Sequence, residues 1–241
     1  MMKEIYTIII VFLCFTGNAQ NFNDVKKVAE SKMAEANYSA GLSEEEVVEG
    51  LKEALNIGVE KGVEQVSKPD GFFKDPEIKI PFPEEVKEVE RKLRKMGQGK
   101  MVDAAIESIN RAAEDAVIDA KDIFMVAIKN MTLTDAIGIL KGDKDAATRY
   151  LEKSTRAALV VKFKPTVKVS LEKVGATRYW NSMFSTYNKI PFVTKVNPDL
   201  DDYATDKAID GLFVQIAKEE LTIRENPTAR VTDLLKKVFE N

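Results

Sequence analysis

Apolar residues recur at helical spacing through most of the chain after residue 42, with polar residues between them. The first pattern starts at a capping box, Ser43 with Glu46, and stops at the turn sequence Lys68-Pro69-Asp70-Gly71. The longest pattern spans Met101–Met131 and is apolar on more than one face, which predicts a central helix contacted from several sides. Further helical patterns cover residues 84–96, 134–142, 143–165 up to a break or kink at Pro165, 197–226 and 231–239. Together they predict a single all-α domain over residues 43–241, folded as a multi-helix bundle.

A proline-rich arm, about residues 67–83, interrupts the helical patterns. Its four prolines, at positions 69, 76, 81 and 83, exclude a helix because proline lacks the backbone N–H and disfavours helical geometry before it. We expect Phe72, Phe73 and Phe82 to be buried, with the arm packed between the first helix and the central one as a structural latch. A loop that binds a partner is the alternative. The similar stretch Lys189–Val193 adds at most a minimal two-stranded patch.

Three glycines, Gly50, Gly58 and Gly62, lie inside the first helical pattern. Each destabilises a helix by about 1 kcal/mol relative to alanine, so a compensating contact is expected. We interpret them as the close approach of another helix, and contact with a ligand is the alternative.

The N-terminus has the pattern of a secretory signal peptide over residues 1–19. A charged start is followed by an apolar run from Ile5 to Phe15 and then by small residues at Gly17 and Ala19. The run is shorter than the roughly 20 residues that span a bilayer, and we expect no transmembrane segment after signal cleavage. Cleavage would also remove the single cysteine, Cys14, so the mature protein would form no disulfide. We therefore predict export to the periplasm or the cell exterior, with residues 20–42 as a polar tether or a loosely docked helix.

Composition and charge exclude several classes of function. The chain has 36 basic and 39 acidic residues, a formal net charge of −3 and no histidine. Nucleic-acid binding needs a basic surplus, so we expect no nucleic acid among the partners. Imidazole-based catalysis and soft metal sites are equally absent from a mature chain without histidine or cysteine. Asn197, Asp199 and Asp201 share the first spacings of a calcium loop, but helix capping explains them better, and we expect no metal and no cofactor.

The central helix carries the remaining candidates for chemistry. Glu107-Ser108 resembles the glutamate-serine start of the helical lytic transglycosylases, which cleave cell-wall glycan with a single acid, although the Gly-Leu-Met-Gln run that should follow is absent. The same pattern also holds a group of polar residues that is large for its apparent burial: Glu107, Asn110, Arg111, Glu114 and Asp122. We interpret this group as a paired, inward-facing network or as a solvated stripe.

Seven short strings occur in an order that points to one family. They are Gly50–Leu55, Lys68–Phe72, Ile78–Pro81, Asn110–Glu114, Asp145–Tyr150, Lys207–Phe213 and Leu234–Phe239. Together they resemble the uncharacterised bacterial "domain of unknown function 4197" family of exported helical proteins, from about residue 43 to the C-terminus. The resemblance implies an envelope location and an all-α fold. It implies no activity and no catalytic residues.

These patterns favour a non-enzymatic binding or interaction module whose partner is an unknown envelope protein or an apolar small molecule. A carboxylate-dependent cell-wall glycan hydrolase or lyase, with Glu107 as its acid, is the alternative. An apolar cavity under Phe72, Phe73 and Phe82 would favour the small molecule, and a filled core with an exposed apolar patch would favour a protein partner. The enzyme requires a groove with a partly buried glutamate at its floor.

Overall fold

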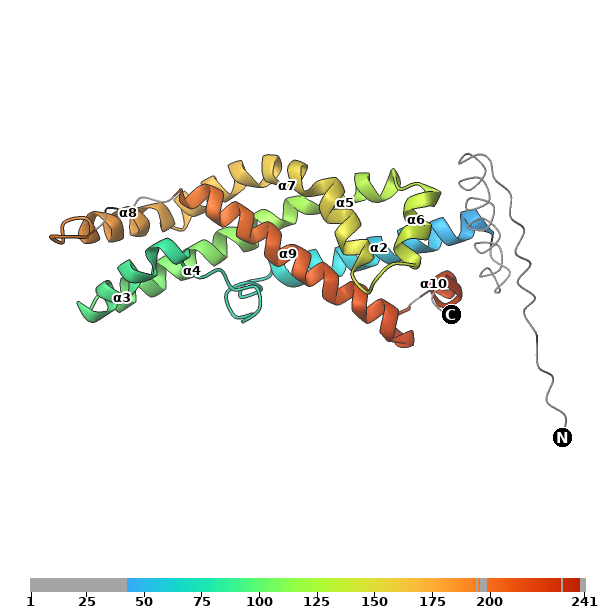
Figure 1. Ribbon diagram of the computed structural model, residues 1–241, viewed down its shortest axis with the longest axis horizontal. Helices are drawn as coiled ribbons and strands as arrows, with labels where there is room; N and C mark the ends of the chain where they lie inside the picture. Colours follow the sequence, from blue (N-terminus) through green and yellow to red (C-terminus); the bar gives the residue numbers. More distant parts are fainter. Residues whose placement is uncertain (1–42, 194, 196–198, 231, 239–241) are drawn as a thin grey trace, which may run out of the picture. The chain divides into compact units, whose positions relative to one another are not determined.

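The computed structural model describes residues 43–193, 195, 199–230 and 232–238 (Figure 1). The predicted signal peptide and the predicted tether at 20–42 lie outside these residues. The helices, with 3-10 turns marked η, are α2 (Glu44–Ser67), η1 (Glu84–Val86), α3 (Lys87–Lys95), α4 (Gly99–Ala116), η2 (Val117–Asp119), α5 (Ala120–Lys129), α6 (Leu133–Leu140), α7 (Ala146–Lys173), α8 (Ala176–Tyr187), α9 (Leu200–Glu225), η3 (Pro227–Ala229) and α10 (Asp233–Val238). No strand forms within the described ranges. The all-α prediction is therefore confirmed, and the two-stranded patch does not form there.

Capping side chains set several of the predicted helix starts. The Ser43 hydroxyl accepts a hydrogen bond from the Glu46 N–H, and the Glu46 carboxylate accepts one from the Ser43 N–H, as the capping box predicts. The Asp199 carboxylate accepts from the Asp202 N–H at the start of α9. Helix capping is thus the observed role of Asp199, as expected.

The predicted central helix is present, but it is divided. Residues 99–116 form α4, a single 3-10 turn follows, and α5 continues to Lys129. The side chains of Ala105, Ala112, Ala113 and Ala116 are buried. Because alanine side chains are small, α2, α7, α8 and α9 can all pack against α4, which makes it the central helix.

Pro165 does not end its helix, so of the two predicted outcomes, a break or a kink, the break does not occur. α7 runs for 28 residues from Ala146 to Lys173 with Pro165 inside it. The proline lies on an exposed face, where water can reach the backbone carbonyl that loses its partner, while Phe163 and Val167 are fully buried on the other side. Burial of these two side chains keeps the helix continuous.

The helix α8 was not expected from the sequence. Gly175, in the left-handed region at φ 75°, separates it from α7. α8 buries Trp180, Met183, Phe184 and Tyr187. Its apolar positions are mostly aromatic and lie between two basic segments, which hid the helical spacing.

The glycines of α2 do mark a close helix approach. A side-chain carbon added at Gly62 would lie 3.3 Å from Ile216 Cγ1, and one added at Gly58 would lie 3.8 Å from Glu219 Cβ. Both neighbours belong to α9, so the predicted close approach of another helix is confirmed at these two positions.

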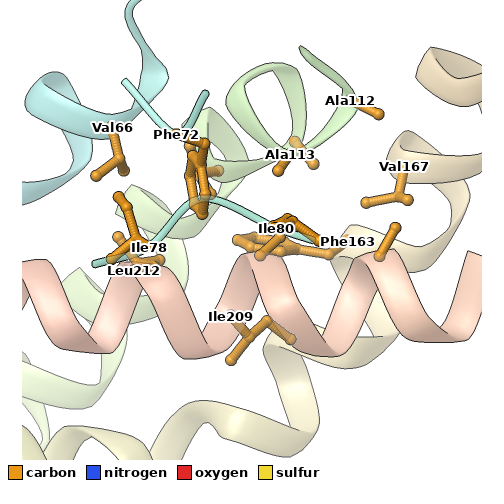
Figure 2. Packing of buried hydrophobic residues seen from close by; sticks show 14 of the residues in the cluster. Val66, Phe72, Ile78, Ile80, Ala112, Ala113, Phe163, Val167, Ile209 and Leu212 are labelled. Carbon is orange, nitrogen blue, oxygen red and sulfur yellow. The ribbon is translucent and has the colours of Figure 1, made fainter. Parts of the chain in front are cut away.

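The core lies where α2, α4, α7 and α9 meet, and the arm contributes to it. Figure 2 shows Phe72, Ile78 and Ile80 of the arm among buried side chains of these helices. Among the described residues, no single helix is long and apolar enough to cross a membrane. One bent pair, Gly99–Lys129 with Leu133–Leu140 at 106°, meets the requirement by length and composition alone.

Candidate functional site

The arm is held to α4 by backbone hydrogen bonds to a buried carboxylate. Glu114 Oε1 accepts from the N–H groups of Phe72 and Phe73, at 3.1 and 3.2 Å. Glu114 is 4% exposed, so these bonds form away from water. Each of the two N–H groups would otherwise be an unsatisfied donor at the edge of the core, because the arm has no helix or strand partner.

Asn110 holds the arm a few residues further along. Its Oδ1 accepts from the Ile80 N–H at 2.8 Å, and its Nδ2 donates to the Ile80 carbonyl at 2.9 Å. The same Nδ2 also donates to the Ile106 carbonyl of α4 at 2.8 Å. The amide thus pairs with both backbone groups of one residue, as a neighbouring strand would, and the arm needs no β-ladder here.

Arg111 joins the carboxylates around the start of the arm. Its guanidinium donates to Glu114 Oε2 at 2.8 Å, to Asp70 Oδ1 at 2.7 Å and to Glu107 Oε1 at 3.2 Å. These bonds, led by the one to Glu114, raise the pKa of Arg111 above its ordinary value. Hydrogen bonds from Lys74 and Arg111 lower the pKa of Asp70. The cluster therefore forms a structural ion-pair network around Arg111.

The other side of the arm packs on α9, which corrects the expected position between α2 and the central helix. A carbon added at Gly211 of α9 would lie 2.5 Å from the Phe72 ring and 3.2 Å from Ile78 Cβ. The Tyr203 hydroxyl of α9 donates to the Pro81 carbonyl at 2.7 Å. The arm thus lies between α4 and α9. Only an aromatic arm opposite a helical glycine allows this approach, and no local pattern in the arm reveals that glycine.

The three phenylalanines of the arm have different environments. Phe72 and Phe82 are 0% and 1% exposed, and the Phe82 ring lies edge-on to Trp180 of α8 with centroids 5.4 Å apart. Phe73 is half-buried, with Lys79 Nζ 4.2 Å from its ring centroid. Phe72 and Phe82 are therefore core residues, whereas Phe73 lies at the rim.

The structure brings together four of the five predicted network residues. Glu107, Asn110, Arg111 and Glu114 all bind the arm or one another, on one face of α4. Asp122 does not join them. It is exposed on α5 and borders a groove between α5 and α7.

Glu107 lacks the environment that a catalytic acid of a glycan hydrolase needs. Its side chain is 49% exposed and is paired with Arg111. The two buried glutamates, Glu114 and Glu220, both accept several hydrogen bonds from backbone and side-chain groups. In the described part of the chain, no group of three or more acidic, histidine or cysteine residues could hold a metal ion.

Sequence reasoning missed a second buried polar cluster around Glu220 on α9. Its carboxylate accepts from the N–H groups of Ala147 and Thr148, at 3.0 and 2.8 Å, and from the Thr148 hydroxyl at 2.7 Å. Arg224 donates to the same carboxylate and to the Ile139 carbonyl. In the sequence, Glu220 and Arg224 look like any surface pair four residues apart. The acid's position between Ala217 and Ile223, on the apolar side of α9, was the available signal.

A partly open pocket lies between α2 and α9, but it is too small for a ligand. Its volume is about 20 Å³, and Leu55, Val59 and Ile216 are among its lining residues. That volume suits about one water molecule. In the arm, Phe72 packs against Gly211 and Phe82 packs against Trp180, so protein atoms fill the space beside both rings.

The larger hollows are open grooves on both sides of α5. The groove between α5 and α7 has a volume of about 520 Å³, and the groove between α2 and α5 has about 610 Å³. Val126, which is 60% exposed, borders both grooves, and Met125, 39% exposed, borders the second. The second groove also contains Asn56, whose buried Oδ1 has no hydrogen-bond partner. We name Met125, Val126 and the two grooves the α5 face.

The described residues thus form an all-α protein with a filled core, a clamped arm and one open, partly apolar face. The chain belongs to the family described as "Protein of unknown function (DUF4197)", whose model matches residues 41–240. The resemblance seen in the sequence is therefore confirmed. No curated protein and no solved structure matches the chain.

Proposed function

We propose that this protein is a non-enzymatic interaction module of the bacterial envelope and that its α5 face binds an amphipathic helix of a partner protein. One observation carries the proposal. The pocket of about 20 Å³ between α2 and α9 is water-sized, whereas the grooves of about 520 and 610 Å³ are large and share the exposed side chain of Val126. A filled core beside an exposed apolar ridge favours a protein partner over an apolar small molecule.

The chemistry of the α5 face suits an amphipathic helix. A helix needs a groove with apolar anchors, and Met125, Val126 and Ile57 provide them. The edges carry both signs of charge, because Glu49 is paired with Lys52 in the second groove and Asp122 borders the first.

Crosslinking at Val126 tests this proposal. A photoreactive residue at Val126 should give one discrete adduct in cells that export the full chain. The matched control is the same residue at Val161, which is 76% exposed on α7 and outside both grooves. With the captured protein purified, Val126→Lys should weaken binding at least about tenfold, because it places a charge in an apolar contact. Equal adducts at both positions, or unchanged affinity of Val126→Lys, would contradict the proposal.

Export is supported by the N-terminal sequence pattern alone and has its own test. We expect the protein recovered from the envelope fraction to begin near Gln20, because the small residues before it suit signal-peptide cleavage. N-terminal sequencing of that protein measures this. A chain that starts at Met1 and stays in the cytosol would contradict it.

We also propose that the arm is a structural latch rather than a binding loop. Phe82→Ala should lower the free energy of unfolding by about 3–5 kcal/mol, since it removes a buried aromatic side chain and leaves a cavity. Urea unfolding measures this loss. Phe192→Ala is the control, because Phe192 is fully exposed and its loss should leave stability within about 0.5 kcal/mol. A Phe82→Ala variant with unchanged stability would point to a binding loop.

A further inference from the structure

Two turns at one end of the described helices each expose an apolar side chain. Met96, at the turn between α3 and α4, is 55% exposed, and Phe192, in the loop after α8, is 107% exposed. α3 packs against α8, and Lys92 Nζ lies 5.4 Å from the centroid of the Tyr187 ring. The two turns are therefore neighbours. Figure 1 shows them at the left, where α3 and α8 end.

The backbone holds Phe192 in a conformation that aromatic residues rarely adopt. Its φ is 64°, in the left-handed region, where a side chain larger than that of glycine is strained. Since the ring is fully exposed, no burial of the side chain offsets this strain within the described structure. An outward aromatic residue on a strained turn is typical of a group that acts on something outside the molecule.

Basic residues predominate around both turns, although Asp103 of α4 is paired with Arg94. The sequence has no acidic residue from Arg91 to Val102 and none from Lys173 to Pro198, although the whole chain has a net charge of −3. Lys95, Lys100 and Lys189 are exposed and form no ion pair within the described residues. We name these three lysines, together with Met96 and Phe192, the basic tip.

We propose that the basic tip binds an anionic phospholipid surface, with Phe192 and Met96 inserted at the level of the headgroups. Exposed aromatic side chains prefer the membrane interface, and lysines beside them gain from the negative surface potential of anionic lipids. The tip has apolar side chains at the apexes of turns with cations around them. A lipid surface can take up such a projecting shape without a complementary pocket, whereas a folded acidic protein would need a matching cavity for Phe192.

The arrangement also separates this surface from the proposed α5 face. Met125 and Val126 belong to α5, whereas the basic tip is built from the ends of α3 and α8 and the start of α4. Failure of either proposal would leave the other standing. Together they would place a partner-binding face on a molecule held at a membrane surface.

Vesicle binding tests the proposal. The protein purified from the envelope fraction is mixed with phosphatidylcholine vesicles that contain either no anionic lipid or about 30% phosphatidylglycerol. We expect at least about tenfold tighter binding to the anionic vesicles, and a marked loss between about 0.1 and 0.5 M salt, since salt screens the lysines. No binding to anionic vesicles at low salt would overturn the proposal.

Variants separate the tip from the rest of the protein, with the N-terminal residues identical in all of them. Phe192→Ala should weaken binding at least about tenfold, and Lys95→Glu with Lys189→Glu should weaken it further. Val161→Ala and Lys61→Glu are the matched controls, because each alters an exposed residue on another helix, outside the basic tip and the α5 face. Equal binding of tip and control variants would overturn the proposal.

A fluorescence measurement shows whether the ring inserts. In Phe192→Trp, brominated lipids should quench the new indole, and the spectrum should shift to the blue on binding. The native Trp180 is 3% exposed, so the wild-type protein gives the background. Two results together would contradict insertion and show a site that depends on charge alone. A soluble polyanion would abolish the binding of wild type and Phe192→Ala equally, and the indole at position 192 would not be quenched.

Discussion

Glu114 and Glu220 each hold two consecutive backbone N–H groups of another segment inside the protein. Glu114 on α4 binds the N–H groups of Phe72 and Phe73 in the arm, and Glu220 on α9 binds those of Ala147 and Thr148 in the first turn of α7. Both acids are buried, at 4% and 8% exposure, and both are paired with an arginine on their own helix. The motif is the same, but its surroundings differ.

The difference lies in the arginines and in the segment that is held. Arg111 has three carboxylate partners and a side chain that is 29% exposed, whereas Arg224 has Glu220 as its carboxylate and is 14% exposed. Glu220 also meets the positive end of a 28-residue helix, which favours a negative charge. The arm has no such dipole. Without its buried glutamate, Arg111 would keep two carboxylate partners, whereas Arg224 would lose its carboxylate. We therefore expect the same motif to contribute less to stability at the arm than at α7.

The largest effect is expected at the cluster without redundancy. Glu220→Ala should lower the free energy of unfolding by about 3–5 kcal/mol, because it leaves Arg224 as a buried charge without its carboxylate and uncaps α7. Urea unfolding measures the loss. Glu219→Ala, at the half-buried neighbouring position, is the control and should change stability much less. A loss below about 1 kcal/mol for Glu220→Ala would break the comparison.

A smaller effect is expected at the arm. Glu114→Ala should lower the free energy of unfolding by about 1–3 kcal/mol, the penalty of leaving the buried Phe72 N–H without an acceptor. The Phe73 N–H is only part-buried and can bind water, and Arg111 keeps Asp70 and Glu107. Parallel urea unfolding of both variants gives the contrast. If Glu114→Ala is as destabilising as Glu220→Ala, the two remaining carboxylate partners of Arg111 do not reduce the loss of stability.

Glycine substitutions sharpen the contrast between the arm and the α2–α9 contact. Gly211→Ala should be destabilising by about 1–3 kcal/mol, because its new carbon would lie 2.5 Å from the Phe72 ring. Gly58→Ala should instead be neutral or stabilising by up to about 1 kcal/mol, since its nearest neighbours are 3.8 Å away and alanine favours a helix. Thermal unfolding of the two variants checks the opposite signs. A Gly211→Ala variant as stable as the wild type would show that the arm can shift away from α9.

The smallest effect concerns pH. Lys74 and Arg111 lower the pKa of Asp70 in the folded protein, so its contribution to stability is present above the unfolded value of about 3.9 and is lost as pH falls through the folded pKa. Stability should therefore fall less steeply below about pH 4 in Asp70→Asn than in the wild type. Urea unfolding between about pH 2 and 6 measures the two slopes. Identical slopes would contradict the prediction, and 1 M salt should reduce the difference, because Asp70 is solvent-accessible.

Local spacing predicted the elements well and their junctions less well. The Ser43–Glu46 box and the Asp199 cap follow from side chains that act within three residues, and the structure has both. At Pro165 the sequence predicted a break or a kink, and the helix does not break, because the effect of a proline depends on whether water or protein surrounds the freed carbonyl. α8 was missed because its aromatic positions do not resemble an aliphatic stripe.

The sequence predicted which residues belong to the candidate site better than it predicted what they do. Glu107, Asn110, Arg111 and Glu114 stood out as too polar for a central helix, and the structure places them together. Asp122 shares their helical pattern, but the 3-10 turn η2 lies between it and them, and it faces a groove instead. The spacing alone contained no sign of that turn.

The sequence by itself determined which segments are helical, where caps begin them and why the proline-rich arm is not a helix, because these properties depend on neighbours a few residues away. The tertiary structure alone decided what the arm packs against and which acid caps α7. Glu114 meets its backbone partners 42 and 41 residues away, and Glu220 meets its partners 73 and 72 residues away. At such separations the energy of a polar side chain depends on which segment folding brings to it. An acid four residues from an arginine gives the same sequence pattern on a protein surface as in a core.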